Sequence, residues 1–216
     1  RFAGVWVGLK TVKETVEATA IVDGDPDRVK LVMPNFVEPE GGLNIRLIDT
    51  PHAQETRMID YKRFAAESFG RVNKIDKRVW GKPGAKIGLM STGKSWLDLQ
   101  QALSILGIDA IEAERLGITT YKVGMPWPLD TRGFEDWAEG LDLLICVEEK
   151  RKLLEVQAKD AIFHTRKGRR VYGWKNDRGE ELFPTRDQLD PVWIAEKLAE
   201  IFIEEGRNTE AIKAGL

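Results

Sequence analysis

The sequence predicts an α/β fold, an open and mostly parallel sheet in three layers, preceded by a helical arm. From Lys86 onward, short apolar runs alternate with amphipathic stretches, which is typical of a parallel sheet covered by helices on both faces. Residues 1–80 lack this alternation. The stretch from Arg71 to Ala85 is basic and rich in glycine and proline, as domain boundaries often are, so we place the boundary there.

The α/β part contains predicted strands that are buried apolar runs bounded by turn residues. They are Lys86–Met90, Ile118–Val123, Leu143–Val147 and Arg170–Trp174. Between and after them, apolar residues recur at helical spacing. The helices predicted from this spacing are Ser95–Leu106, Thr131–Glu139, Leu153–Phe163 and Asp190–Glu205, with a short turn near Ile111–Leu116.

The arm is predicted to contain two helices joined by an irregular segment. The first is Trp6–Thr19, where apolar residues recur at helical spacing. Short β-like pieces at 21–22 and 29–33 flank a strong turn signal, and 34–50 is loop. Thr50-Pro51 predicts the start of the second helix. Its apolar side consists of Met58, Tyr61, Ala65, Phe69 and Val72.

Composition excludes several classes of function. The 33 basic and 35 acidic residues nearly cancel, so nothing favours a nucleic-acid or membrane surface as partner. No apolar run is long enough to cross a bilayer and no signal peptide opens the chain, so we expect a cytoplasmic protein. The chain starts with Arg1 and without methionine, and we interpret it as a piece of a longer polypeptide.

The cysteine and histidine content argues against a metal centre in this chain. The single cysteine, Cys146, lies in an apolar run and is predicted to be a buried strand residue. Together with two distant histidines, His52 and His164, it provides no ligand set for an iron–sulfur cluster or a zinc ribbon. Both histidines are interpreted as structural or solvent-facing.

Residues Gly88–Ser95 match the phosphate-binding pattern of P-loop proteins, G-x-x-x-x-G-K-[ST]. Leu143–Val147 followed by Glu148-Glu149 resembles the strand that ends in a magnesium-binding acid. A P-loop NTPase is therefore one hypothesis. It requires a hydrophobic strand that ends before the first glycine, whereas the residues before Gly88 are rich in breakers. We prefer a strand of about Lys86–Met90 that contains Gly88, followed by a short loop, Ser91-Thr92-Gly93.

Several segments, taken in chain order, together carry a resemblance. They are Ile87–Ser95 with its helix, Tyr121–Leu129, Cys146–Arg151 and the helix with Glu155, Val156 and Gln157. They resemble the transketolase-C-terminal-like domain of indolepyruvate ferredoxin oxidoreductases, within the thiamine-diphosphate 2-oxoacid oxidoreductases. Upstream, the segments Trp6–Lys10, Gly41–Arg46 and Asp60–Lys62 are similar to the stretch that links the pyrimidine-binding domain to it. The resemblance covers nearly the whole chain and weakens after about Arg166.

The resemblance implies a parent enzyme that decarboxylates arylpyruvates such as indolepyruvate, forms an acyl-CoA and passes electrons to ferredoxin. It implies thiamine diphosphate, Mg²⁺, 4Fe-4S clusters and CoA as cofactors of the parent, and none in this chain. The family's G-D-G motif with a distant Asn is missing, because Asp23-Gly24-Asp25 has the wrong order. We therefore expect no catalytic or metal residues here, and a chain that is inactive alone.

The resemblance also implies the domain organisation. Residues 1–80 are expected to be a linker and helical arm from the end of the preceding pyrimidine-binding domain, and residues 81–216 the transketolase-C-terminal-like domain. The role is expected to be structural and interdomain. The expected partners are the remaining domains of the parent enzyme and ferredoxin, with no nucleic acid and no membrane, and a homodimer is left open.

Thr92, Gly93, Lys94 and Ser95 form a candidate anion site, since a helix N-terminus favours negative charge. A phosphate- or CoA-binding module at this position is a second alternative function. The simpler interpretation is that Thr92 or Ser95 caps the helix and Lys94 faces water.

A second set of candidate residues follows two other predicted strands. Glu148, Glu149, Lys150 and Arg151 are interpreted as a neutralised charge cluster at an interface, and the alternative is an acid/base pair of carboxylates. Trp127, held between two prolines, is expected at an interface or at the sheet edge. The basic run Arg166–Arg170 is interpreted as a solvated loop, and the alternative is an anionic partner such as ferredoxin or CoA.

Overall fold

The computed structural model describes residues 1–214, without the side chains of Glu14 and Thr15. It divides into two compact units, unit 1 (Arg1–Lys74) and unit 2 (Ile75–Leu216). Each unit is described by itself. None of the helices within the described residues combines the length and apolar character that crossing a bilayer requires.

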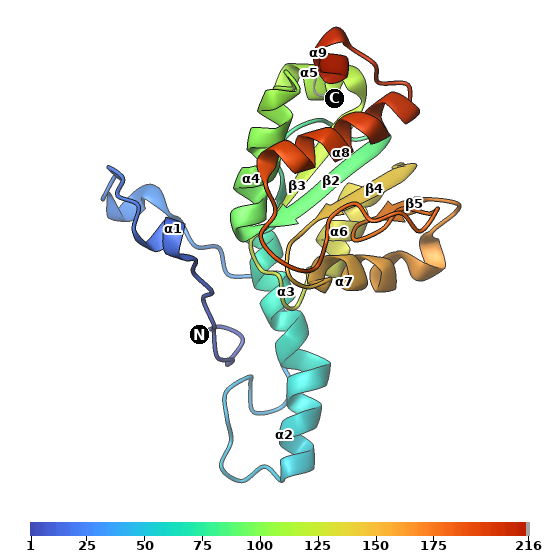
Figure 1. Cartoon of the computed structure of the whole chain (residues 1–216). Helices are drawn as coiled ribbons and strands as arrows, with labels where there is room; N and C mark the ends of the chain where they lie inside the picture. The colour runs from blue at the N-terminus through green and yellow to red at the C-terminus, as the bar shows by residue number, and fades with distance from the viewer. Residues whose placement is uncertain (215–216) are drawn as a thin grey trace. The chain divides into compact units, whose positions relative to one another are not determined.

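Unit 2 is built on a five-stranded sheet in the order β1-β3-β2-β4-β5 (Figure 1). The strands are β1 (Lys77–Arg78), β2 (Ile87–Thr92), β3 (Ile118–Val123), β4 (Leu143–Val147) and β5 (Arg170–Tyr172). Only β1, at one edge, is antiparallel to its neighbour in this sheet; the other pairs are parallel. The predicted α/β fold with a mostly parallel sheet is therefore confirmed.

Helices cover both faces of the sheet and form two apolar cores (Figure 1). One face is covered by α4 (Gly93–Ile105) and α8 (Pro191–Glu204), which contribute Leu99, Leu103, Leu198 and Phe202 to the core. The other face is covered by α6 (Thr131–Ala138) and α7 (Leu153–Ile162), which contribute Phe134, Trp137, Leu154 and Ala158. The remaining helices of unit 2 are α5 (Ala110–Leu116), the 3-10 turn Phe163–Thr165 and α9 (Glu210–Ala214).

Local sequence signals explain where these helices begin and end. Asp109 accepts hydrogen bonds from the backbone N–H groups of Ile111 and Glu112 and so begins α5, and Gly117, with φ of 70°, ends it. Asp190 caps α8 in the same way, ahead of Pro191 in the first turn. These signals explain why the predicted helices lie within about two residues of the observed ones.

The predicted corner after β2 is wrong in one respect. Ser91 and Thr92 continue the strand, and α4 begins directly at Gly93, so the loop Ser91-Thr92-Gly93 does not form. Register explains the difference: Ser91 pairs with Lys122 and Val147, and Thr92 pairs with Val123. Two neighbouring strands thus extend β2 beyond its apolar residues. The predicted last strand also ends earlier, at Tyr172.

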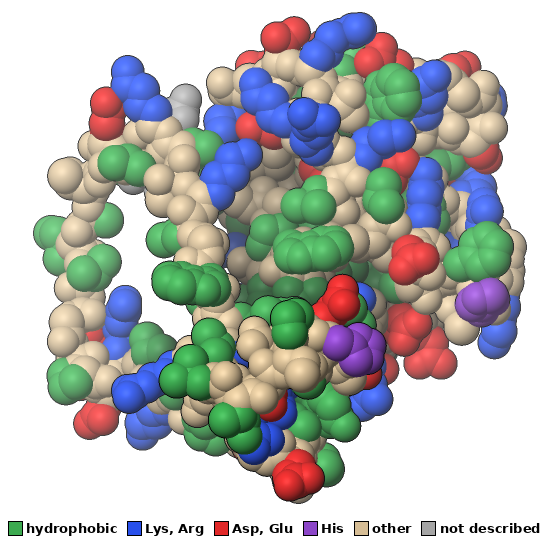
Figure 2. All heavy atoms as spheres, turned by 90° about the horizontal axis from the view of Figure 1, so that it is seen from below, with side chains coloured by type: hydrophobic (Ala, Val, Ile, Leu, Met, Phe, Trp, Pro, Cys, Tyr) green, Lys and Arg blue, Asp and Glu red, His purple; other side chains and the backbone are tan. Residues whose placement is uncertain are grey.

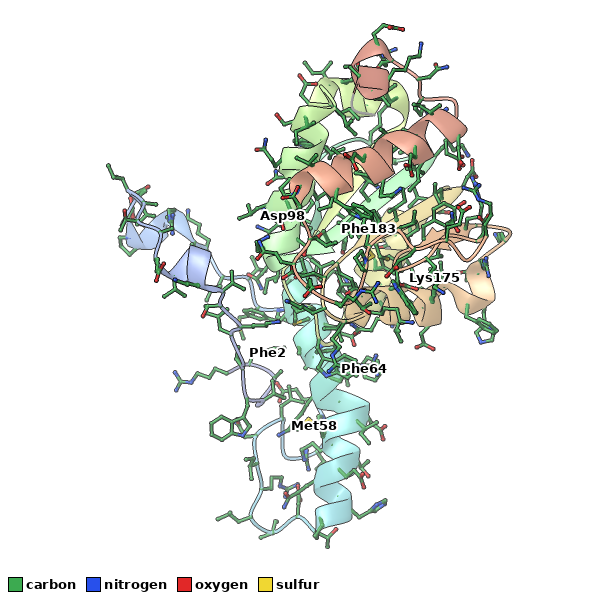
Figure 3. The ribbon with its side chains drawn as sticks, in the orientation of Figure 1. Phe2, Met58, Phe64, Asp98, Lys175 and Phe183 are labelled. Carbon is green, nitrogen blue, oxygen red and sulfur yellow. The ribbon has the colours of Figure 1, made fainter. Side chains whose placement is uncertain are left out.

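Unit 1 contains one long helical segment and little other regular structure. The segment consists of α2 (Pro51–Arg57), a π-helical turn (Met58–Lys62, labelled η2) and α3 (Arg63–Val72). Thr50 accepts a hydrogen bond from the backbone N–H of Ala53 at 3.2 Å, which confirms the predicted start of this helix. The small core of unit 1 consists of Ala3, Leu43 and Ala65, and Phe2, which is labelled in Figure 3, packs against it. The ring of Phe2 also stacks on that of Phe69.

The predicted helix over Trp6–Thr19 is wrong. Only α1 (Lys13–Val16) is helical in this region, followed later by the 3-10 turn Pro26–Arg28. Trp6 and Leu9, which suggested the apolar stripe, are 96% and 86% exposed. A short helix gains most of its stability from burying such a stripe, and no described residue of unit 1 covers it. The β-like pieces at 21–22 and 29–33 are not strands either, because they pair with no other strand within residues 1–214.

Candidate functional site

The carboxyl ends of three parallel strands form one edge of the sheet in unit 2. The strands β2, β3 and β4 end at Thr92, Val123 and Val147. Cross-strand pairing of Thr92 with Val123 and of Ser91 with Val147 places these ends side by side. Open α/β sheets carry their functional groups at this edge. Thr92, Trp127 and the candidates at 93–95 and 148–151 lie at these strand ends or in the segments that follow them.

The hydroxyls at the end of β2 bind the sheet rather than the helix. Ser91 Oγ donates to the carbonyl of Val147 at 2.7 Å, and Thr92 Oγ1 donates to that of Val123 at 2.7 Å. Thr92 occupies the N-cap position of α4 without a side-chain cap bond. The predicted capping role is therefore wrong for Thr92, because its hydroxyl is already used to close the edge of the sheet.

Lys94 does not face water as predicted. Its Nζ lies 2.6 Å from Oδ2 of Asp98, one turn along α4, and the two side chains are only 14% and 11% exposed. Burial raises the pKa of Asp98, the bond to Lys94 lowers it, and the charges of Glu149 and Asp190 raise it again. The charge of Lys94 is thus matched by carboxylates at this helix start.

Gly88 lies inside β2 and is paired on both sides, with Thr119 of β3 and Leu144 of β4. A Cβ at this position would lie 2.5 Å from Leu141 Cδ1 and 2.8 Å from Trp137 Cη2, so only glycine fits here without movement. A P-loop needs its first glycine to open a loop of free backbone N–H groups. The strand geometry does not provide that loop, and the NTPase hypothesis is not supported.

The two carboxylates after β4 point to different elements. The oxygens of Glu148 accept hydrogen bonds from the backbone N–H groups of Leu154 and Glu155, both at 2.8 Å, and so cap α7. Burial raises the pKa of Glu148, and these bonds lower it. Glu149 instead accepts from the backbone N–H of Leu189 at 3.2 Å. The pair therefore holds two segments in place, and the structure does not bring it together as an acid/base pair.

The loop after β3 carries Trp127, which is 67% exposed. Two side chains hold this loop in place, and neither was given this role from the sequence. Asp76 Oδ1 accepts from the backbone N–H groups of Gly124 and Met125, at 2.7 and 2.9 Å. Gln157, on α7, donates to the carbonyl of Pro126 and accepts from the backbone N–H of Leu129. Neither contact has a local sequence signal, since each joins residues far apart in the chain.

Lys150 and Arg151 lie in the turn between β4 and α7. Both are exposed, and Lys150 has a positive φ of 68°. Within the described residues, no ion pair joins either side chain to the carboxylate of Glu148 or Glu149, which bind backbone N–H groups instead. The predicted neutralisation within the cluster is therefore wrong, because the carboxylates of Glu148 and Glu149 point inward and the side chains of Lys150 and Arg151 point to solvent.

The remaining candidates lie in other segments of the chain or inside a strand. The basic run Arg166–Arg170 precedes and begins β5, whose Arg170 pairs with Leu143 at the amino end of β4. His52 belongs to unit 1, and His164 follows α7; both are exposed. Cys146 is fully buried as predicted, and burial raises the pKa of its thiol well above the usual range. Such a thiol is unreactive.

The described residues do not fit the metal and cofactor sets of the parent enzyme that the resemblance implies. Within residues 1–214, no three His, Cys, Asp or Glu side chains gather as metal ligands. The carboxylates at the carboxyl edge, Asp76, Asp98, Glu148 and Glu149, are bound by backbone N–H groups or by Lys94. We therefore assign no Mg²⁺, diphosphate or cluster site to this part of the chain.

Residues 77–216 match the family of indolepyruvate oxidoreductase domains. The chain belongs to this family. The matched range covers more than half of the 216 residues. It also extends beyond Arg166, after which few of the segments that carry the resemblance remain. The sheet with its carboxyl edge is thus that of an indolepyruvate oxidoreductase-type domain of the 2-oxoacid:ferredoxin oxidoreductases.

Two curated relatives are similar over 79 residues: subunit IorA of indolepyruvate oxidoreductase from Pyrococcus abyssi (30% identical) and from Pyrococcus horikoshii (32% identical). In both, the similarity covers 37% of this chain and 11% of the relative, so the chain spans only a small part of their length. Among solved structures, the 2-oxoglutarate:ferredoxin oxidoreductase of Magnetococcus marinus is similar over 89% of this chain and 30% of that chain, with 14% identity and a TM-score of 0.44.

Proposed function

We propose that this chain is the transketolase-C-terminal-like part of a larger indolepyruvate-type ferredoxin oxidoreductase. The observation that carries the proposal is the family match over residues 77–216, together with the small share of the IorA relatives that the chain spans. The parent enzyme would decarboxylate an arylpyruvate such as indolepyruvate, transfer the acyl group to CoA and pass the electron pair to ferredoxin. It would work in the cytoplasm.

In this proposal the chain contributes structure rather than chemistry. Thiamine diphosphate, Mg²⁺ and 4Fe-4S clusters would be held by other parts of the enzyme, because the described residues provide no donor set for them. Residues 1–80 would be the linker from a preceding pyrimidine-binding domain, and residues 81–216 the transketolase-C-terminal-like domain, whose sheet the end of the linker joins through β1 (Lys77–Arg78). Apart from ferredoxin, the partners would be the remaining domains. A homodimer is compatible with this role.

Unit 1 supports an interdomain role by its unusual surface. Large apolar side chains along its irregular segments are almost fully exposed in unit 1, among them Trp6, Leu9, Ile21, Val37 and Leu47. Figure 2 shows such hydrophobic side chains spaced along the segment at the left of the view. Stable proteins rarely leave so much apolar surface in water, so we expect other domains of the enzyme to cover it.

The test is activity of the full-length enzyme against activity of residues 1–216 alone. We expect the anaerobically purified full-length enzyme to reduce a viologen dye with indolepyruvate and CoA, and the isolated chain to show no turnover. Deleting residues 77–216 should prevent the enzyme from assembling. Turnover by the isolated chain, or a full-length protein that uses no 2-oxoacid, would refute the proposal.

A further inference from the structure

The loop after β3 holds an exposed aromatic side chain on a fixed backbone. Trp127 is 67% exposed, yet the residues on either side of it are tied down by Asp76 and Gln157. Prolines at 126 and 128 restrict the backbone further. A large side chain on an already fixed backbone loses less conformational entropy when it binds, which favours it as a central residue of a protein interface.

The apolar surface continues from this loop onto α7. Gln157 donates to the carbonyl of Pro126, accepts from the backbone N–H of Leu129, and donates to the carbonyl of Leu153. The loop therefore lies along the first two turns of α7. On the same face of this helix, Leu153 and Val156 are 41% and 57% exposed. We call Trp127, Leu153 and Val156, with the three bases at 150–152, the Trp127 surface.

The rim of the Trp127 surface is basic. Lys150, Arg151 and Lys152 are consecutive and exposed in the turn before α7. Lys152 Nζ lies 4.8 Å from the ring centre of Trp174, while no described carboxylate forms an ion pair with Lys150 or Arg151. Their charges are therefore available to a partner. An apolar centre with a charged rim is the usual composition of a protein–protein interface.

We propose, on the basis of the function above, that the Trp127 surface docks onto another domain or subunit of the same enzyme, at an apolar pocket bordered by carboxylates. Trp127 enters the pocket, and Lys150 and Arg151 face the acidic border. Asp76 and Gln157 act as positioning residues that hold the loop in its docking conformation. A protein fits better than a nucleic acid, because the second aromatic ring beside these bases, Trp174, already has the ammonium groups of Lys152 and Lys175 at 4.8 and 4.7 Å from its centre and so offers no open face to a nucleotide.

The first test compares the full-length enzyme with the isolated chain by hydroxyl-radical footprinting and mass spectrometry. We expect oxidation of Trp127 to fall about ten-fold or more in the full-length enzyme, as for a residue at the centre of an interface. Trp193, which is 41% exposed on α8, reports on nonspecific protection. Equal oxidation of Trp127 in both samples would overturn the proposal.

The second test uses variants of the full-length enzyme. Trp127→Ala and Arg151→Glu should each raise about ten-fold or more the fraction of full-length enzyme in which this surface is undocked, measured as the oxidation of Leu153 and Val156 by the same footprinting, and the effect of Arg151→Glu should shrink at high salt. Lys167→Glu, a matched reversal in the exposed loop before β5, should change nothing. Because Trp127 is exposed, Trp127→Ala should leave the unfolding midpoint of the isolated chain unchanged. Full assembly by both variants would count against the proposal.

Experiments on the isolated chain test whether another kind of partner binds the Trp127 surface. Protection of Trp127 that grows with its concentration would assign the surface to a second copy, and binding to phosphatidylserine vesicles or a single-stranded oligonucleotide would assign it to a membrane or a nucleic acid. Each result overturns the proposal. Viologen reduction is measured in parallel. An active enzyme with Trp127 exposed refutes only the docking surface, while a protected Trp127 in an enzyme that uses no 2-oxoacid refutes only the function.

Discussion

Arg170 and Glu205 form a bidentate ion pair, with Nη1–Oε1 and Nη2–Oε2 distances of 2.7 and 2.8 Å. Arg170 begins the edge strand β5, and Glu205 follows the last turn of α8, so the pair ties the edge of the sheet to the helix. The hydrogen bonds that Arg170 donates to the carboxylate of Glu205 raise the pKa of Arg170. Paired, planar contacts of this kind are the stronger class of ion pair.

A double-mutant cycle with Arg170→Ala and Glu205→Ala should give a coupling of about 1 kcal/mol in urea unfolding, since the side chains are only 33% and 20% exposed. The matched control is Arg178 with Glu204, where the side chains are 53% and 48% exposed. That more exposed pair should couple less strongly, because solvent and salt screen its charges. Equal couplings for the two pairs would show that burial does not strengthen the first.

Gly88→Ala should destabilise unit 2 by about 1–3 kcal/mol, because the added methyl group overlaps Leu141 and Trp137 in a closely packed core. Urea unfolding followed by circular dichroism measures the loss. Gly24→Ala serves as the control, since nothing lies within 4 Å of its Cβ position. An unchanged midpoint for Gly88→Ala would mean that Gly88 is not in the interior of the sheet.

Asp76 predicts a pH-dependent stability. It is 7% exposed, its Oδ2 has no hydrogen-bond partner among the described residues, and burial raises its pKa above the usual 3.8. The bonds from Met125 and Gly124 lower this pKa, and the charge of Asp130 raises it. The folded chain therefore holds this proton more tightly than the unfolded chain. Stability from Asp76 is complete below the unfolded pKa and is lost as pH rises through the folded pKa.

Asp76→Asn keeps one acceptor oxygen and removes the ionisable group. Its stability relative to the native chain should therefore improve between about pH 4 and pH 7, as measured by urea unfolding across this range. Asp76→Ala should cost about 1–3 kcal/mol at pH 7, because the backbone N–H groups of Gly124 and Met125 lose their acceptor. A relative stability of Asp76→Asn that falls with rising pH would contradict a raised pKa.

Titration of the isolated chain with ATP and Mg²⁺ should give no heat at micromolar affinity, because Gly88 is paired in β2 and Lys94 is bound to Asp98. Lys94→Ala should instead destabilise unit 2 by about 1–3 kcal/mol, since it leaves the carboxylate of Asp98 with little solvent and no cation. Adding Asp98→Asn to this variant should restore part of the loss. Saturable ATP binding that disappears in Lys94→Ala would support the nucleotide hypothesis.

The strands in the interior of the sheet are the elements that were predicted best from the sequence, because burial within the sheet determines their residue types. The bounds of β3 and β4 agree with the predictions residue for residue. β4 is a continuous apolar run, whereas β3 is rich in β-branched and aromatic residues; both are almost entirely buried and are enclosed by turn residues. The strand β1 was missed, since a two-residue edge strand carries no apolar run. The helix at Trp6–Thr19 was wrong, because its spacing of apolar residues indicates a helix only if something covers it.

The candidate site shows the same division. The segments after β2, β3 and β4 could be placed at one edge from strand order alone, since parallel strands end on the same side. The roles of individual side chains could not. Asp76 reaches Gly124 across 48 residues, and Gln157 reaches Pro126 across 31. The side chains of Glu148 and Glu149 point inward because they bind backbone N–H groups of α7 and of Leu189. The positions of those N–H groups cannot be predicted from the order of the strands.

By itself, the sequence determined the class of fold and the family, because buried apolar runs, turn residues and ordered segments are properties of neighbouring residues. Tertiary structure alone decided which polar side chains form hydrogen bonds within the fold and which remain available to bind a partner. Hydrogen bonds and desolvation act at distances of a few ångströms in space, whatever the separation in sequence. Glu149 thus binds the backbone N–H of Leu189, 40 residues away in the chain, whereas Trp127 and Arg151 remain exposed at the carboxyl edge.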